Sequence, residues 1–175
     1  MKNIIIIGAG LAGSYMAYAM GKKGYRVQVF EKRPDPRKSN YGTGRSINLV
    51  VSHRGWTALK YAGIEQDIRE IVVPAYGRQI HDLEGNESYF AYNIEGKAIH
   101  SISRSEFNRK LVELAEALPN VTITFDSNCH HVDFNKGIVQ MQQGEQFNTY
   151  AADLIVGADG TGSSVRGALM KQPRF

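Results

Sequence analysis

Residues 4–13 read Ile-Ile-Ile-Ile-Gly-Ala-Gly-Leu-Ala-Gly, an unbroken apolar run that leads directly into the pattern G-x-G-x-x-G. This stretch predicts a buried strand, a tight turn and a helix. Gly8 allows the turn, Gly10 lets a pyrophosphate approach the backbone, and Gly13 lets the helix pack close to the strand. The N-terminus of the helix then offers unpaired N–H groups and a positive dipole end to phosphates.

An acidic residue closes the next apolar run. Residues 27–31 are expected to form a second parallel strand, and Glu31 lies 18 positions after Gly13. An acid near this spacing accepts hydrogen bonds from the ribose of an adenosine. A glycine-rich turn without a ligand is the alternative, but strand, helix and acid agree, so the sequence predicts a dinucleotide site.

The composition indicates a globular protein. The chain has 175 residues, of which 42% are hydrophobic and 22% charged, which suits one domain with a buried core. No apolar run is long enough for a membrane helix, and no signal-peptide pattern is present. The single cysteine, Cys129, excludes an internal disulfide and favours a cytoplasmic protein. Basic residues are scattered despite a net charge of +4, which argues against a nucleic-acid partner.

The pattern along the chain predicts an α/β fold. After Glu31 the regular alternation of strands and helices is interrupted, which is typical of FAD-binding domains with a substrate-facing insertion. On the first helix we expect Leu11, Tyr15 and Ala19 to lie on one face. The expected helices cover 11–23, 53–62, 64–71, 104–118 and 163–170, and the expected strands cover 3–7, 27–31, 46–51, 78–83, 88–92, 99–103, 121–125, 129–134, 138–142, 147–150 and 153–156.

A second motif follows the last expected strand. Gly157-Ala158-Asp159-Gly160 precedes a predicted helix that begins near Ser163. An ordinary Asp-Gly turn with a helix N-cap explains this motif when it is taken alone. Together with the first motif it resembles the FAD-dependent aromatic hydroxylases. The resemblance implies that Asp159 stabilises the region where the FAD pyrophosphate and the nicotinamide cofactor approach each other.

Further runs make the chain similar to the kynurenine 3-monooxygenases over essentially its whole length. The most specific run is Gly-Arg-Ser-Ile-Asn-Leu at residues 44–49, and Glu-Lys-Arg-Pro-Asp-Pro-Arg at 31–37 also matches. The resemblance implies a Rossmann-like FAD-binding domain with a parallel sheet, a β-meander and a helical and hairpin insertion over about residues 45–105. Because the helical pattern of 163–170 is followed by no closing element, we expect residues 1–175 to be the N-terminal fragment of a longer enzyme.

The same resemblance implies which residues contact FAD. For one of these residues, Arg104, a second argument does not depend on the resemblance. A cation at the start of a helix is unfavourable unless an anion lies nearby. Arg45 is a further expected flavin neighbour. The implied contacts are Leu11 and Ala12 at the pyrophosphate, Glu31, Lys32 and Arg33 at the adenosine, and Val50, Arg104 and Cys129 along the flavin.

The resemblance also implies a substrate site. Arg78, within Gly-Arg-Gln-Ile-His, and Tyr92 are the positions that hold the carboxylate of kynurenine in the family. A guanidinium binds a carboxylate with two parallel hydrogen bonds, and a phenol adds one donor. The hairpin signal Glu84-Gly85-Asn86 allows both side chains to lie on one face, since their numbers differ by an even count. From the residues alone, a surface arginine and a core tyrosine remain the simpler interpretation.

The implied reaction is the hydroxylation of L-kynurenine to 3-hydroxykynurenine by an enzyme that uses FAD, NADPH and O2. No catalytic base is expected, because the flavin supplies the chemistry. No metal site is expected either, because adjacent His130 and His131 should point to opposite faces of a strand. The family's second FAD motif is absent from the sequence, so the fragment alone should be inactive.

Two alternatives stay open at this point. One is another flavin-dependent aromatic hydroxylase, and the other is a stand-alone, non-catalytic dinucleotide-binding module. Membrane association of the full-length protein and its oligomeric state are open as well.

Overall fold

The computed structural model describes residues 1–38 and 47–172, so Arg45 and the first half of the run at 44–49 lie outside the described residues. The chain divides into two compact units. Unit 1 combines Met1–Tyr41 with Asn108–Phe175, and unit 2 is Gly42–Phe107. Unit 2 overlaps the insertion that the sequence predicted. Each unit is described separately.

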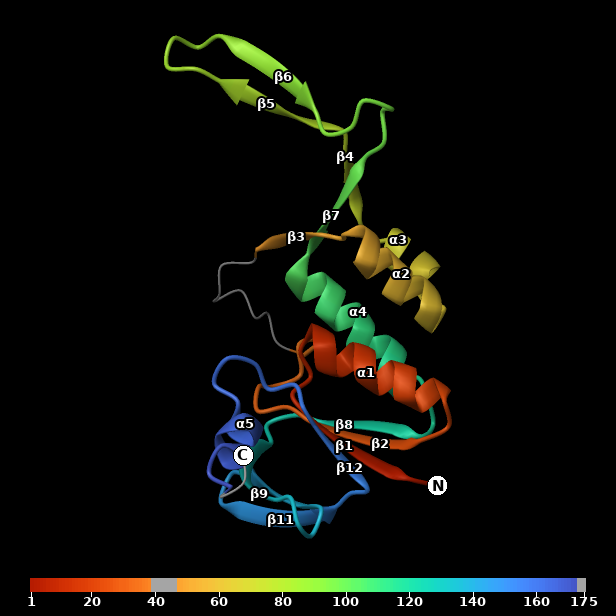
Figure 1. Cartoon of the computed structure of the whole chain (residues 1–175), viewed down its shortest axis with the longest axis vertical. Coiled ribbons are helices and arrows are strands. Elements are labelled where there is room, and N and C mark those ends of the chain that lie inside the picture. Colours follow the sequence, from red (N-terminus) through yellow and green to blue (C-terminus); the bar gives the residue numbers. More distant parts are fainter. Residues whose placement is uncertain (39–46, 173–175) are drawn as a thin grey trace. The chain divides into compact units, whose positions relative to one another are not determined.

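Unit 1 is built on a four-stranded parallel sheet with the strand order β12-β1-β2-β8 (Figure 1). The helix α1 (Leu11–Lys22) connects β1 (Asn3–Ile7) to β2 (Arg26–Phe30). The other two strands are β8 (Val121–Thr124) and β12 (Leu154–Gly157). The predicted α/β class is therefore confirmed.

The strand β8 confirms the expected strand at residues 121–125, whose partner the sequence did not indicate. It pairs in parallel with β2, with Val27 opposite Val121. The preceding helix is α4 (Arg104–Glu116). A parallel pairing needs a long crossover connection, which is usually a helix, and α4 directly precedes β8.

The buried face of α1 also differs from the prediction. The buried residues are Gly13, Ser14, Ala17, Tyr18 and Gly21, rather than the face of Leu11, Tyr15 and Ala19. The side chains of the buried face are mostly small, so α1 approaches its neighbours closely. A Cβ on Gly21 would lie 2.5 Å from Val121 Cγ2.

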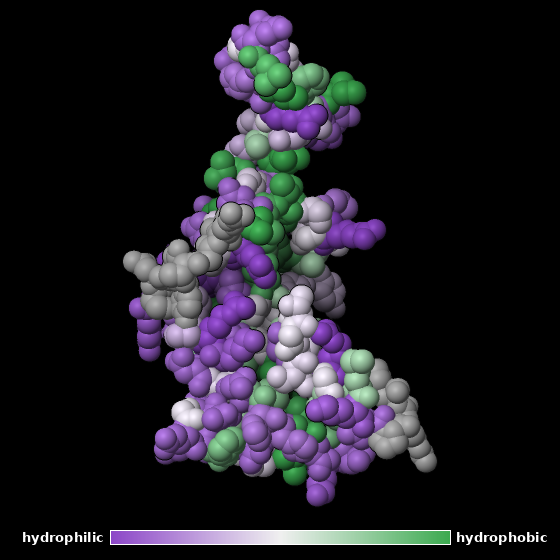
Figure 2. Space-filling view, turned by 90° about the vertical axis from the view of Figure 1, so that its left-hand side faces the viewer, coloured by the Kyte–Doolittle hydropathy of each residue, from purple (hydrophilic) through white to green (hydrophobic). Residues whose placement is uncertain are grey.

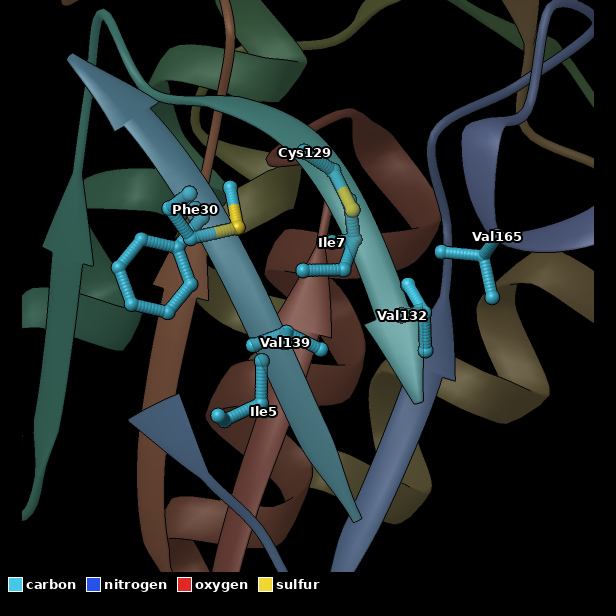
Figure 3. Packing of buried hydrophobic residues seen from close by; sticks show 8 residues of the cluster. Ile5, Ile7, Phe30, Cys129, Val132, Val139 and Val165 are labelled. Atoms are coloured by element: carbon cyan, nitrogen blue, oxygen red, sulfur yellow. The ribbon is translucent and has the colours of Figure 1, made fainter. Parts of the chain in front are cut away.

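The β-meander consists of β9 (Asn128–Asp133), β10 (Ile138–Gln143) and β11 (Gln146–Ala151), which pair in antiparallel fashion. The short helix α5 is Ser164–Leu169. Figure 3 shows how side chains of the meander and α5 pack against those of β1 and β2. The buried members of this cluster are Ile5, Ile7, Phe30, Cys129, Val132, Val139, Met141 and Val165.

The two adjacent histidines of β9 do not alternate as expected. The pairing of β9 with β10 shifts register, because Gln140 is opposite His131 whereas Met141 is opposite Cys129. His130 is thus the extra residue of a β-bulge, and both His130 and His131 are exposed. The expectation that they point to opposite faces was wrong, because a bulge breaks the two-residue period of a strand.

The described residues of unit 2 contain a three-stranded sheet in the order β3-β7-β4, two complete helices, the first residues of α4 and a separate hairpin. Its strands are β3 (Asn48–Val50), β4 (Val73–Ala75) and β7 (Ile99–Ser103), and its helices are α2 (His53–Ala62) and α3 (Glu65–Arg69). The hairpin pairs β5 (Gly77–His81) with β6 (Glu87–Ala91). The sequence did not predict β4, because Pro74 lacks the N–H that a strand interior needs.

Among the described residues, no helix combines the length and the apolar character that crossing a membrane requires.

Candidate functional site

The turn between β1 and α1 requires glycine at two of its three motif positions. Gly8 has a φ of +103°, and a Cβ there would lie 2.5 Å from the carbonyl oxygen of Ala158. A Cβ on Gly13 would lie 1.9 Å from the carbonyl oxygen of Gly8. These contacts are tighter than any real side chain makes, so both positions need glycine for the packing of the turn itself.

Gly10 is different, because a Cβ there would meet no described atom within 4 Å. Its backbone is extended, with a φ of −72°, so packing does not require glycine at this position. Gly10 is the N-cap of α1, it makes no side-chain capping bond, and the first turn of α1 contains no acidic residue. A pyrophosphate requires open space beside N–H groups that have no partner within the helix, and the turn at Gly10 offers both.

Glu31 follows the end of β2 and lies against the glycine turn. Its Oε2 accepts a hydrogen bond from the N–H of Ala9 at 2.7 Å, and its Oε1 accepts one from the N–H of Arg33 at 3.0 Å. Each carboxylate oxygen has a further lone pair, so Glu31 can still accept bonds from a ribose. Lys32 and Arg33 are exposed next to it.

The second motif meets the first although about 150 residues separate them. Gly157 is opposite Ile7 in the parallel sheet, and the N–H of Ala158 donates to the carbonyl of Ile7 at 2.7 Å. Asp159 holds the start of α5: its carboxylate accepts bonds from Ser163 Oγ and from the N–H of Ser164, both at 2.6 Å. The helix-capping role that the sequence offered as an alternative for Asp159 is therefore present.

Cys129 lies in the core below this turn and is 7% exposed. Figure 3 shows its side chain near those of Ile7 and Val132. Burial, with a smaller contribution from the charge of Asp159, raises the pKa of the Cys129 thiol to about 11. The thiol is protonated at neutral pH, and a protonated thiol is a poor nucleophile.

The remaining expected residues belong to unit 2, whereas all those above belong to unit 1. Val50 ends β3 and is 54% exposed. Arg104 is the first residue of α4 and is also exposed.

Arg78 and Tyr92 lie on the same face of the exposed hairpin. Arg78 is opposite Phe90, and the N–H of Tyr92 donates to the carbonyl of Tyr76 at 2.9 Å, which continues the same register. Residues two apart on a strand share a face, so Arg78 and Tyr92 are diagonal neighbours. Tyr92 is 45% exposed, so it is not a core tyrosine.

Sequence reasoning missed the aromatic surroundings of Arg78. The Arg78 guanidinium lies 5.7 Å from the centre of the Phe90 ring, a cation–π distance. Tyr76 and Phe90 are 58% and 49% exposed on this face, and Figure 2 shows apolar surface on the hairpin at the top of the view. The register of the hairpin was the signal that could have identified them. A face with one cation among aromatic rings suits an aromatic carboxylate.

Comparison with curated proteins gives consistent relatives. The kynurenine 3-monooxygenase of Christiangramia forsetii is 44% identical over 177 residues, which cover 99% of this chain and 39% of that protein. The kynurenine 3-monooxygenase of Dictyostelium discoideum is 40% identical over 99% of this chain and 37% of that protein. The chain therefore spans less than half the length of the curated relatives it matches.

Comparison with solved structures supports the fold. The tetrameric form of 2-methyl-3-hydroxypyridine-5-carboxylic acid oxygenase is 28% identical with a TM-score of 0.74, covering 97% of this chain and 42% of that chain. The flavin-dependent monooxygenase PieE, solved in complex with FAD and substrate, has a TM-score of 0.80 at 16% identity, covering 97% of this chain and 32% of that chain. This second likeness shows the fold alone.

The family described as FAD binding domain matches residues 1–173, which is nearly the whole chain. The open backbone at Gly10, the acceptor Glu31 and the packed turn that joins the two motifs agree with this match. The chain belongs to the FAD binding domain family.

Proposed function

We propose that this chain is the FAD-binding part of a monooxygenase that hydroxylates L-kynurenine. The reaction would convert L-kynurenine, NADPH, a proton and O2 into 3-hydroxykynurenine, NADP⁺ and water. The names of the relatives, at 44% and 40% identity over 99% of the chain, support this substrate. The observation that carries the proposal is the hairpin face on which Arg78 and Tyr92 lie together.

In this proposal the residues of unit 1 bind FAD and do not react themselves. The N–H groups at Leu11 and Ala12 face the pyrophosphate, Gly10 leaves room for it, and Glu31 accepts bonds from the ribose of the adenosine. Lys32 and Arg33 lie beside the adenosine, Asp159 lies beside the pyrophosphate, and Cys129 contributes through its backbone. Val50 and Arg104 are further proposed contacts of FAD. When bound, FAD would supply the electron transfer from NADPH and the activation of O2.

Arg78 and Tyr92 would orient the substrate. The guanidinium would pair with the carboxylate of L-kynurenine and the phenol would donate one hydrogen bond. Because the substrate contributes the electron-rich ring, the protein needs no catalytic base for this step. Its contribution is to hold the ring in one orientation and to exclude water.

The direct test is steady-state oxidation of NADPH by the full-length protein, with and without L-kynurenine. We expect L-kynurenine to stimulate oxidation and 3-hydroxykynurenine to accumulate in step with the NADPH consumed. If a different aromatic acid stimulates NADPH oxidation and L-kynurenine does not, the protein is another aromatic hydroxylase. The 28% identity to a pyridine carboxylic acid oxygenase is the observation that favours this second candidate. A protein that binds FAD but never oxidises NADPH would be a non-catalytic module. Residues 1–175 alone should form no product.

Arg78 supplies a sharper test of the substrate site. Arg78→Ala should weaken L-kynurenine binding by about 2–5 kcal/mol, as for removing one partner of a desolvated charge pair. Arg78→Lys should recover only part of this loss, because an ammonium lacks the planar fork. The affinity for FAD should be nearly unchanged in both variants.

The matched control is Arg69→Ala in unit 2. Arg69 also stacks on an aromatic ring, at 4.4 Å from the centre of Trp56, but it is paired with Glu65. It should leave the affinity for L-kynurenine unchanged. Wild-type affinity in Arg78→Ala, measured by substrate titration, would remove Arg78 from the substrate site.

A further inference from the structure

A network of charged side chains joins the segment after β2 to the end of α4. Asp35 is only 7% exposed, and its carboxylate accepts three hydrogen bonds from Arg37: from the backbone N–H at 3.0 Å, from Nε at 2.8 Å and from Nη2 at 2.7 Å. Nη1 of Arg37 donates to Glu116 Oε2 at 2.6 Å. The guanidinium also lies 5.8 Å from the centre of the Phe125 ring, just after β8.

The network stays charged at neutral pH. The side-chain hydrogen bond from Arg37 holds the pKa of the Asp35 carboxyl below its ordinary value, although burial acts in the opposite direction. Each of the three guanidinium nitrogens has a carboxylate partner, which only the planar fork of an arginine can arrange in this way.

The segment that precedes this network carries the expected adenosine contacts. The carbonyl of Glu31 accepts a bond from the N–H of Ser127 at 2.9 Å, and that of Arg33 accepts one from the N–H of Asp126 at 3.1 Å. Pro34 and Pro36 follow, and each proline restricts its own φ and the residue before it. Backbone bonds thus hold both ends of residues 31–33, and a stiff connection through Pro34 and Pro36 ties Arg33 to Arg37.

We propose that Arg37 is a positioning residue for the adenosine end of FAD. Through the Pro34–Pro36 connection, it fixes where Glu31, Lys32 and Arg33 present their polar groups, and it does not touch FAD itself. The proposal rests on the proposed function only in that FAD is the ligand. A binding site needs its contact residues held by such supporting bonds, since a small displacement weakens every contact at once.

The experiment compares Arg37→Lys with the wild type in the full-length protein freed of flavin. FAD affinity is read from flavin fluorescence, ADP affinity from calorimetry, and the melting temperature is measured without ligand. We expect both affinities to fall by about tenfold, the low end of what removing a supporting hydrogen-bond partner costs. Because ADP contains the adenosine and both phosphates but no flavin ring, the two affinities should fall by the same factor.

Arg69→Lys is the matched control. Arg69 also pairs with a carboxylate, through Nε at 3.0 Å and Nη2 at 2.7 Å to Glu65, and also lies over an aromatic ring, but it belongs to unit 2. Because its pair is more exposed, Arg69→Lys should lower the melting temperature less than Arg37→Lys does, and it should leave both affinities unchanged. Glu116→Gln removes only the second carboxylate, so it should lower the FAD and ADP affinities by a smaller factor. If Arg37→Lys does not fold, the affinities of Glu116→Gln test the positioning role instead.

The outcomes separate this proposal from the proposed function. Unchanged ADP and FAD affinity in Arg37→Lys, or a loss for FAD without one for ADP, overturns the positioning role. An equal loss in Arg69→Lys also overturns it, because the effect would then be one of general stability. A wild-type protein that binds neither FAD nor ADP overturns the proposed function instead.

Discussion

The glycines of the β1–α1 turn carry two physical roles, tight packing at Gly8 and Gly13 and open backbone at Gly10, and single substitutions should separate the two roles. Gly13→Ala places a Cβ 1.9 Å from the Gly8 carbonyl oxygen, so it should cost about 3 kcal/mol of folding free energy, as severe overpacking does. Gly10→Ala meets nothing within 4 Å and has a compatible backbone, so stability should be kept or slightly raised. Its FAD affinity should fall by about 1.5–3 kcal/mol, the worth of a hydrogen bond to a charged group.

Urea unfolding and FAD titration of both variants check this prediction. A Gly10→Ala variant that is stable and binds FAD like the wild type would show that the pyrophosphate does not approach the backbone there. Gly13→Ala serves as the control for a purely structural effect of a methyl group in the same turn.

Cys129 should make stability fall at high pH. Its pKa is about 11 in the folded protein, against an ordinary value of 9.0. Between these values the unfolded chain releases the proton while the folded protein keeps it, so the free energy of unfolding decreases as pH rises from about 9 to about 11. Urea unfolding between pH 7 and pH 11 should show this decrease, and Cys129→Ala should show a smaller one. An identical slope in both proteins would contradict the assignment.

At the scale of the element, the start of α5 depends on Ser163. Its Oγ accepts a hydrogen bond from the N–H of Arg166 at 2.9 Å and donates to Asp159 Oδ1 at 2.6 Å. Ser163→Ala should therefore cost about 1 kcal/mol or more, as the loss of an N-cap does. The α2 cap is the control, since Ser52 Oγ accepts only the N–H of Gly55 at 3.2 Å among its described bonds. In chemical unfolding, Ser52→Ala should lower the free energy of unfolding by less than Ser163→Ala does. Equal losses would show that the bond from Ser163 Oγ to Asp159 adds no stability.

Elements differ in how well their sequences predict them. Ser52 and Gly63 mark both ends of α2, where Gly63 has a φ of +76°, so this helix could be predicted from local signals. The helix α4 ends at Glu116, two residues before the expected end. The strand β4 was not predicted, because Pro74 argues locally against a strand and the pairing with β7 that forms it is not a local feature.

For the whole molecule, FAD binding should stabilise the fold. A ligand that binds only the folded protein adds about 2.7 kcal/mol at a concentration one hundred times its dissociation constant. We expect FAD to raise the melting temperature of the flavin-free protein, and ADP to raise it at its own saturating concentration. In Gly10→Ala most of this rise should be lost. If FAD does not change the melting temperature of the wild-type protein, the prediction that this chain binds FAD is contradicted.

The sequence by itself determined the strand–turn–helix of the first motif, the capped helix α2 and the hairpin. Each follows from residues that are close in the chain: an apolar run, the glycines, a Ser cap or a turn signal. The cofactor and the substrate residues were inferred from resemblance, and the shared face of Arg78 and Tyr92 followed from counting residues along two paired strands.

Only the tertiary structure decided the features that depend on contacts between distant residues. It placed Ala158 against Gly8, β8 beside β2, and the small-residue face of α1 against the sheet. It also revealed the bulge that exposes both His130 and His131, and the bonds that tie Arg37 to Asp35 and Glu116. The physical reason is the same in each case: local propensity sets the period of an element, whereas its partners set which face is buried and where the period breaks.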